Sequence, residues 1–267
     1  MRPEGWDESP GATANTTATT PTLLVRRGVL SPQLRNYRDI LVAMPASATF
    51  GTTRRYPVVY LQDGQNLFDD TTSYVEPWGL LEILGRLAAA GHEAIVVGVP
   101  NIGRFRRYEY SPFRDIIHGG GGGDRYLAFL IETVKALVDR DFPTDPRPAA
   151  TILGGSSLGA LISAYGACRH PDIFAGALIQ SPALWFADAA ILDWLETRRR
   201  PARVHLDVGT DEGEEAVEDV RRLRDLWVSQ GAVLDADLSY LEEEGASHHE
   251  HAWARRLERA LPFLLAP

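Results

Sequence analysis

Short apolar runs alternate along this chain with longer segments in which apolar residues recur every three or four positions. Short runs rich in Val, Ile and Leu are typical of strands that are covered on both faces of a sheet. This pattern predicts strands at residues 22–25, 38–44, 57–62, 93–99, 150–154, 176–180, 204–208 and 234–241. The first two come before any long helical segment, so we expect them to pair antiparallel at one edge of the sheet.

The segments between the later strands have helical periodicity. Residues 78–90 and a segment that starts at Asp124 follow this pattern, as does the end of the chain from Trp253 onward. In residues 214–230 the apolar side chains fall on one stripe, and the pattern stops at Gly231. The alternation predicts an α/β fold, with a mainly parallel central sheet, helices on both faces and functional loops at the carboxyl ends of the strands.

Composition places limits on the class of protein. Residues 1–21 are rich in Thr, Ala, Pro and Gly and lack the apolar segment of a signal peptide, so we expect a flexible N-terminal leader before a single domain at residues 22–267. The net charge of −9 argues against a nucleic-acid surface. Cys168 has no second cysteine to pair with, and no segment resembles a membrane span. We therefore expect a cytoplasmic protein without nucleic-acid or membrane partners.

The most specific chemical signal is Gly-Ser-Ser-Leu-Gly at residues 155–159, which joins a predicted strand directly to a helical run. In this context G-x-S-x-G forms a nucleophile elbow. Glycine is needed on both sides because larger side chains would clash in so tight a turn. Ser157 is therefore the candidate nucleophile, with a glycine-rich turn in an ordinary α/β protein as the alternative.

A serine nucleophile needs a general base and an acid that orients it, and in this fold they follow in the order Ser, Asp or Glu, His. Asp211 and Glu212 come after the predicted strand at residues 204–208, and His248 and His249 come after the last predicted strand. Imidazole, with an ordinary pKa of about 6.5, can accept the serine proton and return it to the leaving group. Either carboxylate could instead stabilise the dipole of the following helix, so both stay candidates.

Two backbone N–H groups would complete such a site by binding the negative oxygen that develops during acyl transfer. Leu158 directly follows the candidate nucleophile and supplies one N–H. The loop after residues 57–62 reads Asp-Gly-Gln-Asn, and Gln65 is its best placed donor. A plain β-turn would explain the Asp-Gly pair equally well.

A metal site is the alternative reading of the histidines at positions 248, 249 and 251. His249-Glu250 does not continue into the HExxH spacing, and the sequence suggests no further ligands nearby. We therefore expect neither a metal nor a cofactor.

Taken together, these segments resemble the "Putative esterase" family of α/β-hydrolases, which includes enterochelin esterases, S-formylglutathione-hydrolase-like proteins, feruloyl and acetyl-xylan esterases and the mycolyltransferases. The matching segments are residues 38–42, 56–68, 95–99, 107–112, 155–159, 181–182, 207–210 and 245–248, followed by Trp253. The likeness covers residues 22–265 in the family's order, which is far more specific than the elbow alone. One departure is Ala160, where many relatives have a second glycine.

The resemblance implies an α/β-hydrolase fold with Ser157 as nucleophile and His248 as base. It favours Glu212 as the acid and keeps Asp211 in reserve, because the family's loop reads Gly-Thr-x-Asp/Glu. Further residues on loops near the strand ends are candidates for binding an aryl or acyl ester: Asn66, Trp78, Arg107, Glu109 and Trp185. The two tryptophans could instead belong to the core.

The implied activity is hydrolysis of a small-molecule carboxylic ester through an acyl-enzyme. An acyltransferase would use the same residues and pass the acyl group to an alcohol instead of water. A catalytically silent binding module is the other alternative, but intact Ser157, His248 and Glu212 argue against it. The sequence does not indicate the oligomeric state.

Overall fold

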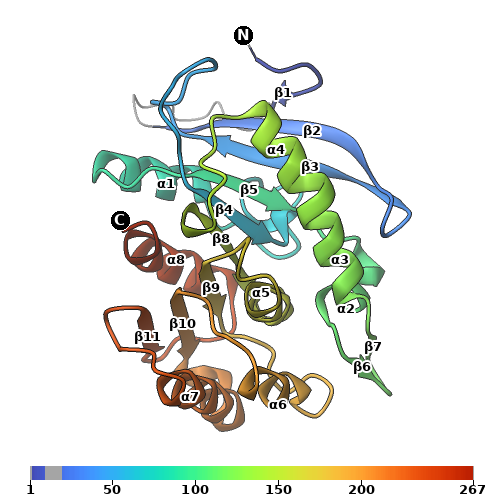
Figure 1. The fold of residues 1–267 in the computed structure, drawn as a ribbon, viewed down its shortest axis with the longest axis vertical. Helices are drawn as coiled ribbons and strands as arrows, with labels where there is room; N and C mark the ends of the chain where they lie inside the picture. The colour runs from blue at the N-terminus through green and yellow to red at the C-terminus, as the bar shows by residue number, and fades with distance from the viewer. Residues whose placement is uncertain (1, 10–19, 267) are drawn as a thin grey trace.

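The computed structural model describes residues 2–9 and 20–266 of the chain. Its centre is a nine-stranded sheet in the order β1-β2-β3-β5-β4-β8-β9-β10-β11 (Figure 1). The strands of this sheet are β1 (Asp7–Glu8), β2 (Thr22–Ser31), β3 (Asn36–Met44), β4 (Val58–Gln62), β5 (Ile95–Val99), β8 (Thr151–Ser156), β9 (Gly176–Gln180), β10 (Arg203–Gly209) and β11 (Leu238–Glu243). A separate hairpin pairs β6 (Arg114–Asp115) with β7 (Gly119–Gly120).

The sheet is antiparallel at one edge and parallel elsewhere. β1 pairs antiparallel with β2, β2 with β3 and β3 with β5, whereas every pairing from β5 through β4 to β11 is parallel. The central strands are buried along their whole length, as continuous apolar runs require. The sequence prediction of a mainly parallel sheet with an antiparallel edge is confirmed.

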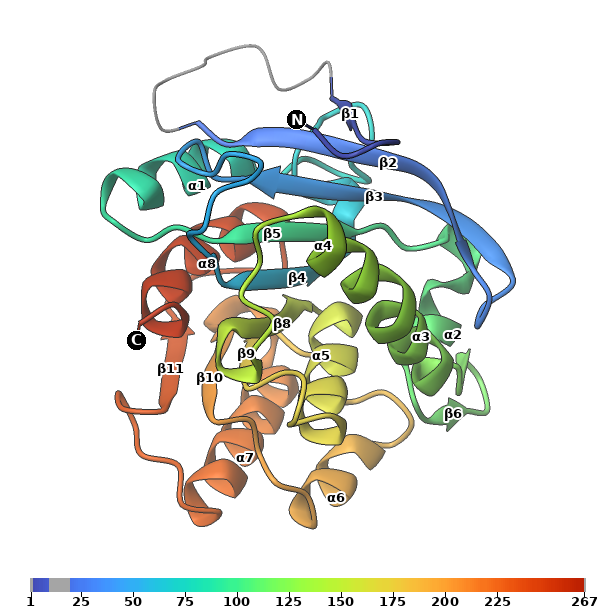
Figure 2. The ribbon, with the colours of Figure 1, turned by 45° about the horizontal axis from the view of Figure 1, so that its top comes forward.

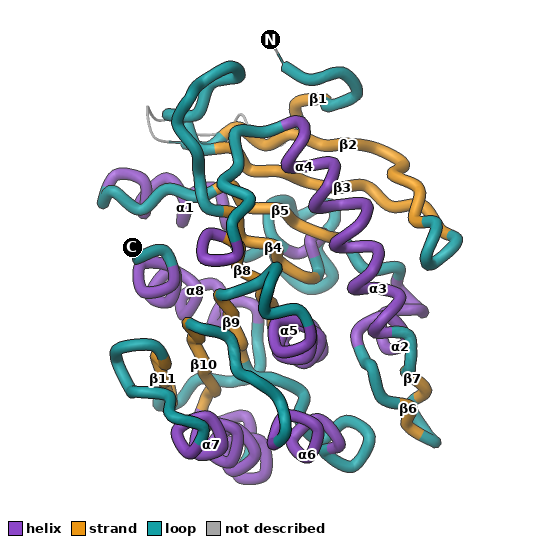
Figure 3. Tube along the Cα trace, viewed as in Figure 1, coloured by secondary structure: helices purple, strands orange, loops and turns teal. Residues whose placement is uncertain are grey.

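Helices cover both faces of this sheet (Figures 2 and 3). They are α1 (Leu80–Ala89), α2 (Arg106–Tyr110), α3 (Gly123–Phe129), α4 (Ala136–Asp141), α5 (Leu158–Arg169), α6 (Ala190–Glu196), α7 (Glu214–Ser229) and α8 (Glu250–Leu264). Apolar residues of α1 and α8 form the core on one face, and those of α3 to α7 form the core on the other. Within the described part of the chain, no helix is long and apolar enough to cross a membrane.

Parallel pairing determines where the chemically interesting loops meet. The carboxyl ends of β8, β10 and β11 all lie on the same side of the molecule, because parallel strands point the same way. The elbow serine follows β8, the two candidate carboxylates follow β10, and the candidate histidines follow β11. Residues that lie about 90 positions apart in sequence are thereby brought to one place.

The elements differ from the sequence predictions mainly at their boundaries. β11 begins at Leu238 instead of residue 234, because the residues before it form a turn in which Asp237 Oδ1 accepts the Val233 N–H at 2.7 Å. The glycine run at residues 119–123, which the sequence analysis assigns to no element, contributes Gly119–Gly120 to the β6–β7 hairpin and opens α3 at Gly123. Hairpins this short leave no detectable period in a sequence.

The prediction of a flexible leader at residues 1–21 does not fit residues 2–9, which include a strand. Residues 1 and 10–19 lie outside the described residues. β1 pairs with β2, and the Trp6 side chain is only 1% exposed. Its ring packs edge-on against Phe142 at 4.8 Å between centroids, and its Nε1 donates to Asp141 Oδ2 at 2.8 Å. The composition of residues 1–21 gave no indication that Trp6 is buried.

Replacing this tryptophan should destabilise the fold. Trp6→Ala removes a buried ring and a hydrogen bond, and we expect the free energy of unfolding to fall by about 3–5 kcal/mol. Chemical denaturation of the two proteins measures the difference. Asp7→Ala, at an exposed position next to it, is the control and should have little effect. Equal stability of Trp6→Ala and the wild type would contradict the anchoring role.

Candidate active site

Ser157 lies at a strained turn between β8 and α5. Its backbone has φ 58° and ψ −123°, a conformation that L-residues rarely adopt. A Cβ atom at Gly155 or at Gly159 would come within 3.0 Å or 2.9 Å of Gln62 Cβ, so both glycines are required by close packing against β4. The Ser157 N–H donates to Gln180 O at 3.0 Å, which fixes the turn to the end of β9.

His248 faces this serine. Its Nε2 lies 3.0 Å from Ser157 Oγ, and its Nδ1 lies 2.7 Å from Glu212 Oε2. When Nδ1–H donates to the carboxylate, Nε2 is left as the acceptor for the serine hydroxyl. The ring stands edge-on against Trp253, with centroids 4.8 Å apart and an interplanar angle of 88°. The imidazole is therefore held in one orientation from two sides.

Glu212, and not Asp211, is the carboxylate that meets His248. The Glu212 side chain is 2% exposed, whereas Asp211 is exposed at the surface. Glu212 Oε1 accepts hydrogen bonds from Ser181 Oγ at 2.6 Å and from the Gly209 N–H at 2.8 Å. Burial alone would raise the pKa of Glu212, but the hydrogen bonds from His248, Ser181 and Gly209 favour its charged form, and the net pKa is lowered.

Arg256 on α8 is a buried residue at this site that sequence reasoning missed. Its side chain is fully buried, and its guanidinium lies 3.4 Å from Glu212, 3.3 Å from Asp207 and 3.7 Å from Glu243. A buried charge is tolerable only with such partners. Its position three residues after Trp253 places both side chains on the inner face of α8, which is the one sequence signal that pointed to it.

Ser181 is a second missed residue. Its hydroxyl donates to Glu212 and accepts from Arg256 Nη2 at 2.9 Å and from Trp253 Nε1 at 3.0 Å, so its hydrogen-bonding capacity is fully used. Its backbone has φ 42°, another strained position at a strand end. In the sequence, Ser181-Pro182 stands out only as one of the segments that carry the family resemblance.

The loop after β4 lies beside the elbow. A Cβ atom at Gly64 would be 2.5 Å from Gly98 C, so only glycine allows this close approach. Asp63 is held at φ 55° by two hydrogen bonds from Arg106, at 2.9 and 2.8 Å. Asp63 Oδ2 is 3.4 Å from the point where a Gly159 Cβ would lie. The Gln65 and Leu158 N–H groups thus belong to neighbouring segments, and their oxyanion role stays a prediction.

The other residues predicted to bind substrate have different environments. Trp185 is 51% exposed and lines a cavity together with His248. Asn66 Oδ1 accepts the Tyr74 N–H at 3.1 Å, so its side chain orders the loop before α1. Arg107 lies in a separate groove near α2.

Two of these predictions need correction. Trp78 is 6% exposed and packs in the core, with its ring centroid 6.2 Å from that of Trp253. Glu109 is 1% exposed and forms a buried ion pair with Arg38 at 2.8 Å. Neither side chain can reach a substrate in this structure, because their partners already cover them.

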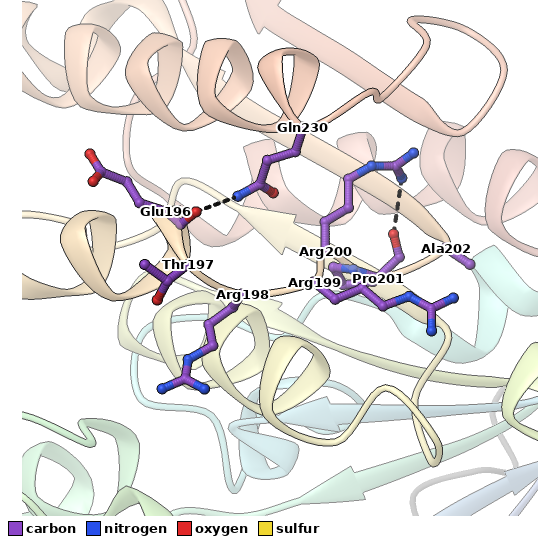
Figure 4. Close-up of a pocket in the computed structure, with 8 residues that line it drawn as sticks. All are labelled: Glu196, Thr197, Arg198, Arg199, Arg200, Pro201, Ala202 and Gln230. Carbon is purple, nitrogen blue, oxygen red and sulfur yellow. Dashed lines mark hydrogen bonds between the residues drawn. The ribbon is translucent and has the colours of Figure 1, made fainter.

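The cavity at the site has a volume of about 540 Å³. Its lining combines apolar residues with Glu212 and His248 of the candidate site: Ser181, Pro182, Ala183, Leu184, Trp185, Val208, Glu212, Gly213, Glu214, Glu215, Ala216, Asp219, Val220 and His248. Another cavity of similar volume is lined by residues 196–202 and Gln230 (Figure 4). That cavity lies at the start of β10, the opposite end of the strand from Glu212, and plays no part in this site.

His249 and His251 point elsewhere than His248. His249 Nδ1 lies 2.9 Å from Glu76 Oε1, and His251 Nε2 lies 2.7 Å from Glu76 Oε2. Glu76 therefore connects the loop before α1 to the start of α8. Among the described residues, no group of three or more His, Cys, Asp or Glu side chains is arranged to hold a metal ion.

Known proteins resemble this chain in sequence and in fold. A siderophore triacetylfusarinine C esterase of Aspergillus fumigatus is 29% identical over 147 residues, which are 51% of this chain and 47% of that protein. The BES protein from Bacillus cereus has a similar structure, with a TM-score of 0.72 and 22% identity over 96% of this chain and 97% of the other. The siderophore hydrolase EstB from Aspergillus nidulans gives a TM-score of 0.69 and 22% identity, with 90% and 95% of the two chains covered.

At these identities the solved structures establish the α/β-hydrolase fold alone. The family is decided by a match that spans most of the sequence: the model of the family described as "Putative esterase" covers residues 31–264. The chain therefore belongs to the "Putative esterase" family, and it is a carboxylic ester hydrolase.

Proposed function

We propose that this protein hydrolyses esters through a covalent acyl-enzyme on Ser157. Ser157 Oγ attacks the ester carbonyl while His248 Nε2 accepts the hydroxyl proton. His248 then gives that proton to the departing alkoxide, which leaves as an alcohol. In the second half, His248 accepts a proton from water while the water oxygen attacks the acyl-enzyme carbonyl. His248 then returns the proton to Ser157 Oγ as the acyl–Oγ bond breaks, which releases the acid product and the free serine. Glu212 holds the imidazole in the required tautomer and stabilises its charged form.

The observation that carries this proposal is a pair of hydrogen bonds made by His248. Its Nδ1 lies 2.7 Å from Glu212 Oε2, and its Nε2 lies 3.0 Å from Ser157 Oγ. A serine within hydrogen-bond reach of a base that is itself oriented by a carboxylate is the arrangement that activates a nucleophile. Leu158 begins α5, so its N–H has no partner within the helix and is free to bind the carbonyl oxygen as it becomes negative. Gln65 N–H is the second donor in this proposal.

For the substrate, we propose an ester of the siderophore type. The relative from Aspergillus fumigatus supports this class, because its activity is an esterase activity on a siderophore. The site cavity of about 540 Å³, with the exposed Trp185 in its wall, suits a bulky acyl or aryl group better than a short acetyl group. A panel of 4-nitrophenyl esters, feruloyl and acetylated sugars, and catecholate and hydroxamate siderophores tests the class. A clear kcat/KM preference for acetylated sugars would contradict it.

Ser157→Ala should abolish hydrolysis of every active ester in that panel. Loss of a nucleophile lowers kcat by about 10⁴ to 10⁶, so the effect will be unmistakable. A serine-directed phosphonate should label one residue, identified by peptide mass mapping as Ser157. Ser156→Ala is the matched control, since Ser156 ends β8 and has a buried side chain. Labelling at Ser156, or activity retained by Ser157→Ala, would rule out the assignment.

Glu212→Gln should lose far more activity than Asp211→Asn. The amide cannot stabilise the charged imidazole, and we expect kcat to fall by about 10⁴. Asp211 is exposed, and its backbone N–H, which donates to Ala246 O, is unaffected by the substitution. Steady-state kinetics of both variants on one 4-nitrophenyl ester provide the comparison. The reverse order of losses would make Asp211 the orienting acid.

His248→Ala should be nearly inactive, whereas His249→Ala should keep substantial activity because His249 pairs with Glu76.

In the wild type, kcat/KM should fall on acidification, since a protonated base cannot accept the serine proton. The lowered pKa of Glu212 keeps that carboxylate ionised on mild acidification, so protonation of Glu212 does not cause the fall. A pH–rate profile of wild type and His249→Ala checks this. A flat acidic limb, or an inactive His249→Ala, would contradict the assignment of the base.

A further inference from the structure

A second groove lies between α2 and the β6–β7 hairpin, elements that lie side by side in the ribbon (Figures 1 and 2). Its volume is about 780 Å³. The lining contains basic, aromatic and small residues. They are Arg104, Arg107, Tyr108, Pro112, Arg114, His118, Gly119, Gly120 and Gly121. The mechanism above uses none of these side chains.

Within the described part of the chain, the arginines of this groove have no carboxylate partner. Arg104, Arg107 and Arg114 are exposed, and no ion pair to any of them is found among the described residues. Arg106, on the same helix, is by contrast bound to Asp63 at 2.8 Å. Asp115, on the hairpin, accepts the Ile117 and His118 N–H groups at 2.7 and 2.6 Å. Three unpaired guanidinium groups in a chain of net charge −9 form a local positive site.

The groove is held in shape by its own backbone. The Gly122 N–H donates to Tyr108 O at 2.9 Å, and the Gly121 and Gly123 N–H groups donate to Ser111 O at 2.9 and 3.1 Å. A Cβ atom at Gly122 would lie 2.4 Å from the Tyr108 ring, so the glycine run packs directly on α2. The hairpin is thus fixed against the helix, and the arginines are presented by a preformed surface.

One wall connects this groove to the active site. The His118 ring, which lines the groove, stands edge-on against Trp185 at 5.5 Å between centroids. Trp185 also lines the cavity that contains His248 and Glu212. The lining of that cavity also contains the acidic residues Glu214, Glu215 and Asp219. Trp185 therefore lies between a cavity whose lining contains acidic side chains and a groove whose lining contains arginines.

We propose that this groove binds an anionic part of the ester substrate, its carboxylate or phenolate oxygens, while the ester bond lies at Ser157. Guanidinium groups bind such oxygens through paired, charge-assisted hydrogen bonds, and Tyr108 and His118 offer rings for an attached aromatic or acyl segment. The substrate extends past Trp185, with its anionic end in the groove. This inference rests on the proposed function, because it assigns the reacting bond to Ser157.

Matched esters that differ only in charge test this proposal. One set is the 4-nitrophenyl monoesters of dicarboxylic acids from succinate to suberate, each compared with its methyl-capped neutral counterpart. The other is the butyrate ester of 3-hydroxybenzoate, compared with that of its methyl ester. The measured quantity is the kcat/KM of the anionic ester divided by that of the neutral one, at low and high ionic strength.

In the wild type we expect this ratio to reach about tenfold or more in at least one pair, the factor that one charge-assisted hydrogen bond supplies. It should fall as salt screens the exposed arginines. Arg107→Gln, and Arg107→Gln combined with Arg104→Gln and Arg114→Gln, should bring the ratio towards one, and Arg107→Lys should keep part of it. Arg199→Gln is the control, since Arg199 lines the cavity at the opposite end of β10 and should leave the ratio unchanged (Figure 4). Thermal unfolding confirms that each variant folds.

The outcomes separate this inference from the proposed function. If neither ester is hydrolysed, or if Ser157→Ala hydrolyses both, the proposed function fails. If the wild type hydrolyses both with a ratio near one in every pair, or if the arginine variants keep the wild-type ratio, only the groove proposal fails. The fully exposed Ile116 and Ile117 on the hairpin suggest a third outcome. If the arginine variants lose binding to phosphatidylglycerol vesicles while their ester ratio is unchanged, the groove contacts a lipid surface, and the proposal is overturned.

Discussion

The geometry of the candidate active site depends on the close contact between the loop after β10 and the loop after β11. A Cβ atom at Gly209 would lie 2.1 Å from Ala246 O, so only glycine permits this approach. The Asp211 N–H donates to Ala246 O at 3.0 Å, and the Gly245 N–H donates to Thr210 Oγ1 at 2.8 Å. Because these backbone bonds fasten the two loops together, Glu212 and His248 meet although 36 residues separate them.

A cluster of buried charges supports the same contact. Arg256 is surrounded by Asp207 on β10, Glu243 on β11 and Glu212 in the loop after β10, so its positive charge offsets the burial of Glu212. Removing Arg256 would leave buried negative charges uncompensated, which costs more than the pair itself contributes. The inner face of α8 therefore has two functions. Trp253 supports the His248 ring, and Arg256 places its positive charge 3.4 Å from Glu212.

The environment on the two sides of Trp185 differs in charge. The cavity beside Glu212 carries further acidic side chains, whereas the groove behind His118 carries unpaired arginines. An esterase site with like charge on all sides would select substrates by net charge alone. Opposite charges placed on either side of one aromatic wall can instead orient a substrate that has distinct ends. The acidic side chains belong to α7, whereas the arginines belong to α2, the residues just before it and a hairpin with two-residue strands.

The sequence by itself determined the strand runs, the mainly parallel sheet and the elbow at Ser157, because these depend on local periodicity and on the steric need for glycine. It did not decide between Glu212 and Asp211, since adjacent residues differ only in the direction of their side chains, and the β10–β11 loop contact sets that direction. Nor could it place Trp78 or Glu109. Both belong to segments expected near the site, and their burial follows from partners distant in sequence, Trp253 and Arg38. Only tertiary packing creates those neighbours.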